Sequence, residues 1–138
     1  MITLPPDCVR WIMRNGEDND CAIAAISLAT GTSYEHCLGL AMNITPKATS
    51  VGLTLRQIRA VITALKLNSR VRRKFDLEED TGILWVSNSK DEHVVYLWEG
   101  RILEPSLGCR ALWLDPKAYL EEQKYKATSL IVVEHPEA

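Results

Sequence analysis

One of the four cysteines occupies a position where its thiol could act as a nucleophile. Cys21 directly precedes the apolar segment 22–29, with the polar residues 18–20 in front as capping material and Gly31 behind as a stop signal. This order predicts a helix that begins at Cys21, and the free N–H groups and dipole of a helix N-terminus favour a thiolate. The same N–H groups could bind the oxyanion formed when a carbonyl is attacked. The alternative is a buried structural cysteine, which is the more frequent role.

A thiol nucleophile needs a base, and His93 is the best placed of the three histidines. It opens the apolar strand predicted after the polar loop 87–92, where a sheet could hold the ring beside a cleft. His36 neighbours Cys37 on a predicted helix, but adjacent helical residues project in different directions. His135 lies in a polar tail. We therefore expect His93 to be the general base.

The hairpin that contains His93 brings a carboxylate into reach. If residues 99–100 form a two-residue turn, Trp98 pairs with Arg101, and the register continues along both strands. His93 and Glu104 then lie on one face of the sheet as diagonal neighbours. A turn of three residues would reverse this parity. The sequence thus predicts a nucleophile, a base and an orienting carboxylate in the order Cys21, His93, Glu104.

The elements that must position these residues follow from the hydrophobic pattern. Apolar periodicity, capping residues and β-branched runs predict helices first and antiparallel strands afterwards, which indicates an α+β fold. The expected helices are 21–30, a segment starting at Ser33, a segment opened by the capping box Thr54/Gln57, and 115–124 with Pro116 at its first position. The expected strands are 69–75 as an exposed edge, 82–87, 93–98, 101–104 and 128–134.

Length and charge exclude several classes of function. The 138 residues fit a single domain, 1–138, and the net charge of −2 attracts neither nucleic acid nor anionic lipid. A basic run at 70–74 is followed by an acidic run at 76–80 that would largely cancel its field. Because no apolar run approaches the roughly 18–20 residues of a membrane span, we expect neither a nucleic-acid nor a membrane partner.

The cysteines and glycines point to no cofactor. The cysteines are dispersed without a Cys-x-x-Cys pair, no cluster of Cys and His has metal-ligand spacing, and no glycine-rich phosphate loop is present. We expect no metal and no cofactor. The N-terminus lacks a basic region followed by an apolar stretch, so a cytoplasmic protein with reduced thiols is expected.

The order of these segments resembles the papain-like cysteine peptidases, most closely the bacteriocin-leader-processing (double-glycine) type and its relatives. The resemblance covers roughly residues 13–105 and is carried by segments 20–25, 50–55, 93–96 and 102–105. It implies a papain-like fold, with a central helix that starts at the cysteine and packs on an antiparallel sheet. It also implies a peptide or protein substrate.

Three positions differ from the family pattern. Asn15 stands where the family has a glutamine that donates to the oxyanion, and Asn19 is a second candidate for that role. Ala22 replaces a frequent glycine, and Glu104 replaces an aspartate or asparagine. Two hypotheses follow: a thiol hydrolase, namely a cysteine peptidase or isopeptidase with a Cys-His-Glu triad, or a catalytically degenerate module that binds or inhibits proteins.

Overall fold

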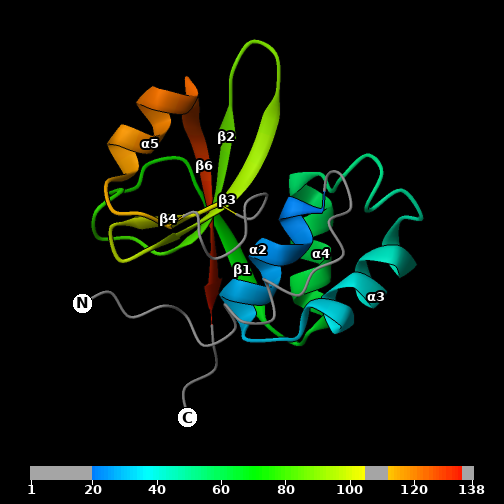
Figure 1. The fold of residues 1–138 in the computed structure, drawn as a ribbon. Helices are drawn as coiled ribbons and strands as arrows, with labels where there is room; N and C mark the ends of the chain where they lie inside the picture. Colours follow the sequence, from blue (N-terminus) through cyan, green and yellow to red (C-terminus); the bar gives the residue numbers. More distant parts are fainter. Residues whose placement is uncertain (1–19, 105–111, 135–138) are drawn as a thin grey trace.

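The computed structural model describes residues 20–104 and 112–134, which form helices packed on a six-stranded antiparallel sheet (Figure 1). The α+β class predicted from the sequence is confirmed. None of the described helices is both long and apolar enough to cross a membrane. The elements in chain order are α2 (Cys21–Thr30), α3 (Tyr34–Ile44), α4 (Leu55–Ala64), β1 (Asn68–Arg72), β2 (Gly82–Ser87), β3 (Glu92–Trp98), β4 (Arg101–Leu103), β5 (Leu112–Trp113), α5 (Pro116–Gln123) and β6 (Lys126–Glu134).

The helices begin and end where the capping residues predict. The Ser33 hydroxyl accepts a hydrogen bond from a backbone N–H of the first turn of α3. Thr54 and Gln57 form both bonds of the capping box that opens α4. Asp115 caps α5 with its side chain, and Gly31 ends α2 in the left-handed conformation, with φ of 73°. Side-chain chemistry thus sets these boundaries locally, and these predictions are confirmed.

The expectation that Asp20 acts as capping material for α2 is wrong. Asp20 occupies the N-cap position, but its side chain makes no capping hydrogen bond, and residues 18 and 19 lie outside the described part. Its φ and ψ of −93° and 11° differ from the extended backbone typical of a capping residue. Its Oδ2 instead accepts a hydrogen bond of 2.7 Å from the Tyr34 hydroxyl, and the residue is 1% exposed. Asp20 therefore ties the start of α2 to α3.

The strand order in the sheet is β1-β6-β2-β3-β4-β5. The predicted edge strand 69–75 is the edge strand β1, although it ends at Arg72. The last strand of the chain, β6, lies between β1 and β2 and pairs with both. The short strand β5, which pairs with β4, was not predicted. The first and last strands of the described range therefore lie side by side, with β1 at the edge of the sheet and β6 inside it.

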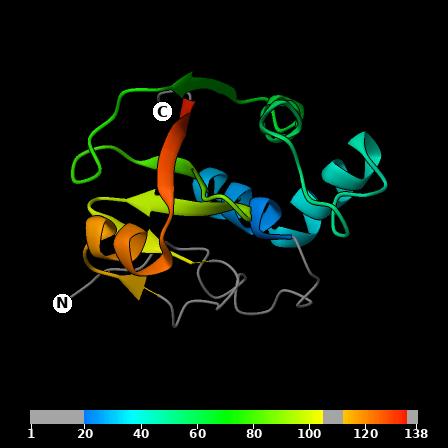
Figure 2. The same cartoon turned by 90° about the horizontal axis from the view of Figure 1, so that it is seen from above.

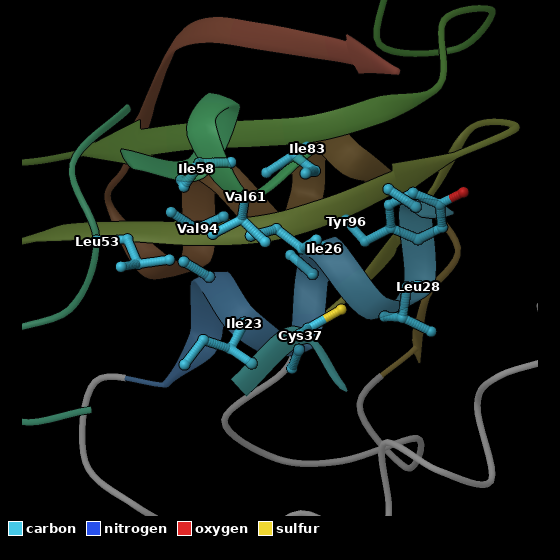
Figure 3. Close-up of a cluster of buried hydrophobic side chains, with 14 of the residues drawn as sticks. Ile23, Ile26, Leu28, Cys37, Leu53, Ile58, Val61, Ile83, Val94 and Tyr96 are labelled. Carbon is cyan, nitrogen blue, oxygen red and sulfur yellow. The ribbon is translucent and has the colours of Figure 1, made fainter. Parts of the chain in front are cut away.

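Two hydrophobic clusters lie on opposite faces of the sheet. Helices α2, α3 and α4 gather on one side of the molecule and α5 on the other (Figures 1 and 2). The larger cluster packs α2 residues such as Ile23 and Ile26 against Ile58 of α4 and Val94 of β3 (Figure 3). Residues 22–29 of α2 are all buried, as a helix apolar on every side requires. This burial fixes the position of Cys21 at the helix start.

The β3–β4 hairpin has the turn that the sequence predicts. Trp98 pairs with Arg101, and the register continues to Tyr96 opposite Leu103. The two turn residues, Glu99 and Gly100, have φ of 48° and 76°, which is typical of the turns that match the twist of a two-residue hairpin. This turn therefore fixes which side chains of β3 and β4 point to the same face of the sheet.

Candidate active site

Cys21 is the first residue of the buried helix α2, as predicted, and its thiol is free and partly exposed. The first helical hydrogen bond of α2 runs from the Ala24 N–H to the Asp20 carbonyl, at 3.1 Å. The N–H groups of Cys21, Ala22 and Ile23 consequently have no acceptor within the helix. They lie at the positive end of the helix dipole, beside the sulfur.

His93 and Glu104 lie together on one face of the sheet, as the hairpin register requires. His93 Nε2 is 2.5 Å from Glu104 Oε1, and their side chains are 14% and 8% exposed. The prediction that this carboxylate reaches this imidazole is confirmed. Because Nε2 is engaged by Glu104, Nδ1 is the ring nitrogen that remains for another partner.

Cys21 and His93 come together in a small pocket. Its volume is about 90 Å³, and both residues line it. Cys21 also acts on the imidazole, because its interaction with the ring raises the pKa of His93. The complete lining comprises Cys21, Ala22, Val51, Gly52, Leu53, Trp85, Glu92, His93 and Val94. The thiol and the imidazole therefore face a space that a reacting group could enter.

The electrostatic environment favours a protonated imidazole at His93. Burial lowers the pKa of His93, but side-chain hydrogen bonds with Cys21 and Glu104, together with their negative charges, raise this pKa. The net effect raises the pKa of His93 from 6.5 to about 10. At neutral pH, His93 therefore carries a positive charge between two acidic partners.

Tyr119 of α5 supports the carboxylate from the other side. Its hydroxyl donates a hydrogen bond of 2.5 Å to Glu104 Oε2, and the residue is completely buried. Burial and the negative charge of Glu104 raise the pKa of Tyr119 far above its usual range, so the hydroxyl remains a donor. Both oxygens of Glu104 are thus held, one by His93 and one by Tyr119. No signal in the sequence related Tyr119 to Glu104.

Aromatic rings hold the imidazole and Tyr119 in place. The Tyr125 ring stacks on His93 with centroids 6.0 Å apart and on Tyr119 with centroids 6.4 Å apart. Trp113 packs edge-on against Tyr119 at 5.4 Å. These contacts restrict the rotation of the rings around the site.

The loop before α4 forms the opposite wall of the pocket. Val51, Gly52 and Leu53 line it, and Val51 is 71% exposed. Gly52 has φ of 91°, a conformation that favours glycine over residues with a Cβ. This is the glycine of segment 50–55, which contributed to the family resemblance. The loop therefore presents an apolar side chain and bare backbone next to the thiol.

Other residues considered in the sequence do not join this site. Asn15 and Asn19, the expected oxyanion donors, lie outside the described residues, as do Cys8, Cys109 and His135. Cys37 is fully buried in the larger hydrophobic cluster, and His36 is exposed on α3. Within residues 20–104 and 112–134, no group of three or more His, Cys, Asp or Glu could hold a metal ion.

The basic run 70–74 makes contacts within the protein. Arg70 lies 3.7 Å from a carboxylate oxygen of Glu134, and Arg72 lies 3.2 Å from Asp80 of the acidic run. Arg73 donates a hydrogen bond to the Ser129 hydroxyl. These contacts bind the guanidinium groups to the protein itself and reduce the local positive field.

Comparisons of the chain with protein-family models, with curated proteins and with solved structures gave no match. A functional interpretation therefore depends on the geometry of the pocket at Cys21.

Proposed function

We propose that this chain is a papain-like thiol hydrolase, a cysteine peptidase or isopeptidase that acts on a peptide or protein. One observation carries the proposal: Cys21 and His93 line one open pocket, and the His93 imidazole is held by Glu104 at 2.5 Å. The start of a buried helix at Cys21 and the antiparallel sheet that carries His93 agree with the expected papain-like arrangement. Each group has the chemistry that its role requires.

In the first half of the reaction, the Cys21 thiolate attacks the carbonyl carbon of the scissile amide. A C–S bond forms, and the carbonyl oxygen becomes an oxyanion. The His93 imidazolium gives its proton to the amide nitrogen, the C–N bond breaks, and the amine leaves. The enzyme is left with a thioester at Cys21 and a neutral imidazole at His93.

In the second half, water replaces the amine. His93 takes a proton from the water as the water oxygen attacks the thioester carbonyl. The C–S bond then breaks, the acid product leaves, and the thiolate–imidazolium pair is restored. Glu104 stabilises the positive charge on His93 in this resting state and keeps Nε2 occupied, so that Nδ1 serves the reacting atoms.

The helix N-terminus supplies the oxyanion donors. The backbone N–H of Cys21 has no acceptor within α2 and lies next to the sulfur, where the oxyanion of an attacked carbonyl would form. An amide N–H from Asn15 or Asn19 would complete this site, as expected from the sequence. The positive end of the α2 dipole adds to the stabilisation.

Labelling by thiol-directed probes tests the proposal. A peptidyl vinyl sulfone or iodoacetamide should label Cys21 rapidly at pH 7, and Cys21→Ala should abolish this labelling. Cys37→Ala is the matched control, because Cys37 is buried in the core away from the pocket. His93→Gln should slow the labelling of Cys21 roughly a hundredfold or more, the range for loss of a general acid–base group.

A binding or inhibitor module of the same fold gives different results. Cys21 would then react no faster than an unstructured cysteine of a denatured chain, and His93→Gln would leave its rate unchanged. Labelling that maps to Cys37 would also contradict the proposed nucleophile.

A further inference from the structure

The charged residues that line a second hollow of the molecule are all lysines. This hollow has a volume of about 590 Å³ and lies between the β2–β3 loop and the connection from α5 to β6. Its lining contains three lysines and no carboxylate, although the whole chain has a net charge of −2. The lining residues are Ser87, Asn88, Ser89, Lys90, Gln123, Lys124 and Lys126. We refer to this space as the lysine hollow.

The lysines of the hollow differ from the arginines of the basic run. Arg70 and Arg72 pair with carboxylates. In the described part of the chain, the ammonium groups of Lys90, Lys124 and Lys126 lie within 4.0 Å of no carboxylate oxygen. Three like charges around one space repel one another unless an anion joins them. The lysine hollow is therefore suited to a negatively charged ligand.

The backbone that carries these lysines is held by hydrogen bonds. The Asn88 side chain accepts a hydrogen bond from the Lys90 N–H at 2.8 Å and fixes the loop. Lys124 ends α5 in the left-handed conformation, and its N–H bonds back to the helix. Lys126 pairs with Ser87 across β6 and β2. Little backbone ordering is needed on binding, which favours affinity.

The nearest acidic residues do not line the hollow. Asp91 accepts a hydrogen bond from the Glu92 N–H and lies 3.4 Å from the Tyr125 hydroxyl, and Glu92 lines the pocket at Cys21. Glu121 and Glu122 are exposed on α5 and do not line the hollow. The neutral lining residues carry hydroxyl and amide groups that can donate hydrogen bonds to carboxylates.

Tyr125 connects the lysine hollow to the candidate active site. It lies between Lys124 and Lys126 in the sequence, and its ring stacks on His93 at 6.0 Å. The residue that stacks on the imidazole is thus flanked on both sides by lysines of the hollow. In the proposed reaction, His93 protonates the departing nitrogen, so this is the leaving-group side.

We infer that the lysine hollow binds an acidic segment of the substrate, on the leaving-group side of the scissile bond. This inference rests on the proposed function for the position of the segment, but the binding itself does not require catalysis. The volume lies in the range of sites for organic ligands and exceeds that needed by one small anion. A peptide segment with several carboxylates therefore fits better than an isolated ion.

Binding of short peptides tests this inference directly. We expect the full chain to bind acetyl-Glu-Glu-Glu-Glu-amide in calorimetry or amide chemical-shift titrations at low salt, and not the matching Gln peptide. Replacing the three lysines (Lys90→Gln, Lys124→Asn and Lys126→Gln) should weaken binding roughly tenfold. Asn suits position 124 because it tolerates the left-handed conformation. The control variant carries Lys47→Gln, Lys74→Gln and Lys117→Gln, with the same change in charge, and should bind as the wild type does.

Equal affinity for the Glu and Gln peptides, or equal weakening in both triple variants, overturns the inference. Inorganic phosphate that competes fully at the concentration of the Glu peptide would identify a simple ion site and would also overturn it. Cys21→Ser should retain peptide binding. Lysine-dependent binding combined with an unreactive Cys21 would therefore reject the hydrolase and leave the acidic-peptide site intact.

A cleavage assay tests on which side of the scissile bond the acidic segment binds. Quenched-fluorescence peptide pools with Glu at the second to fourth residue after the scissile bond should be cleaved faster by the wild type than pools with Gln there. The variant at Lys90, Lys124 and Lys126 should lose this preference and cleave the Glu and Gln pools at the same rate. A preference for Glu before the scissile bond instead would overturn the assignment to the leaving-group side.

Discussion

The Tyr119 hydroxyl donates a hydrogen bond to Glu104 Oε2, at 2.5 Å, while the other oxygen of the same carboxylate contacts His93 Nε2. The carboxylate is therefore held at both oxygens and cannot turn away from the imidazole. Glutamate has one more rotatable bond than aspartate, and the tyrosine removes this additional freedom. The contact explains how a longer acidic side chain can orient His93.

Tyr119→Phe should weaken the site without disturbing its packing. Phenylalanine keeps the ring between Trp113 and Tyr125 and removes only the hydroxyl. Because a hydrogen bond to a charged group contributes about 1.5–3 kcal/mol, we expect Cys21 to be labelled roughly ten times more slowly. The acid limb of the pH profile of the labelling rate should move to higher pH. The reason is that loss of the Tyr119 hydroxyl disfavours the ionised form of Glu104.

Tyr96→Phe is the control for this substitution. Tyr96 is also a buried tyrosine, but it lies on β3 and belongs to the hydrophobic cluster on the face packed by α2. Removing the Tyr96 hydroxyl should leave the labelling rate of Cys21 and the acid limb of its pH profile unchanged. If the two variants behave alike, Tyr119 does not position Glu104.

Glu104→Gln should lower the pKa of His93 from about 10. The substitution removes the negative charge of Glu104, which is one of the causes that raise this pKa, and keeps the size of the side chain. The alkaline limb of the labelling profile, where the imidazolium loses its proton, should move to lower pH. The pKa can also be measured directly from the His93 ring resonances in NMR titrations. An unchanged pKa would show that the carboxylate does not set the charge of the imidazole.

The sequence predicted the features that local chemistry decides. The capping box of Thr54 and Gln57 sets the start of α4 through bonds within one helical turn. The turn at residues 99–100 fixed the parity that brings His93 to Glu104, because side chains alternate along paired strands. A site distributed over helix and hairpin could thus be assembled from short-range rules.

The sequence did not predict the features that depend on tertiary packing. The position of β6 between β1 and β2 depends on pairing of strands far apart in the chain, for which local patterns carry no signal. The same holds for the contact of Tyr119 with Glu104, which depends on how α5 docks. The sequence indicated that Asp20 caps α2, but its carboxylate accepts a hydrogen bond from the buried Tyr34 hydroxyl instead.

Gly52→Ala should destabilise the wall of the pocket. A φ of 91° is unfavourable for alanine, and we expect a loss of about 1–2 kcal/mol in the free energy of unfolding measured with urea. Gly39→Ala is the matched control, because Gly39 lies inside α3 and a Cβ there would meet nothing within 4 Å. Alanine at position 39 should be neutral or stabilise by up to about 1 kcal/mol. Equal effects at the two positions would show that the loop tolerates a Cβ.

The raised pKa of His93 predicts how stability depends on pH. The pKa is about 10 in the folded protein and near 6.5 in the unfolded chain, so the folded state binds the proton more tightly. The stabilisation from the charged imidazole is complete below about pH 6.5 and is lost as pH rises through about 10. Urea unfolding of the wild type and of His93→Gln at pH 6, 8 and 10 isolates this contribution from other titrating groups. We expect the wild type's advantage in free energy of unfolding to shrink steadily over this range. An advantage that stays constant from pH 6 to 10 would mean that His93 is neutral in the folded protein.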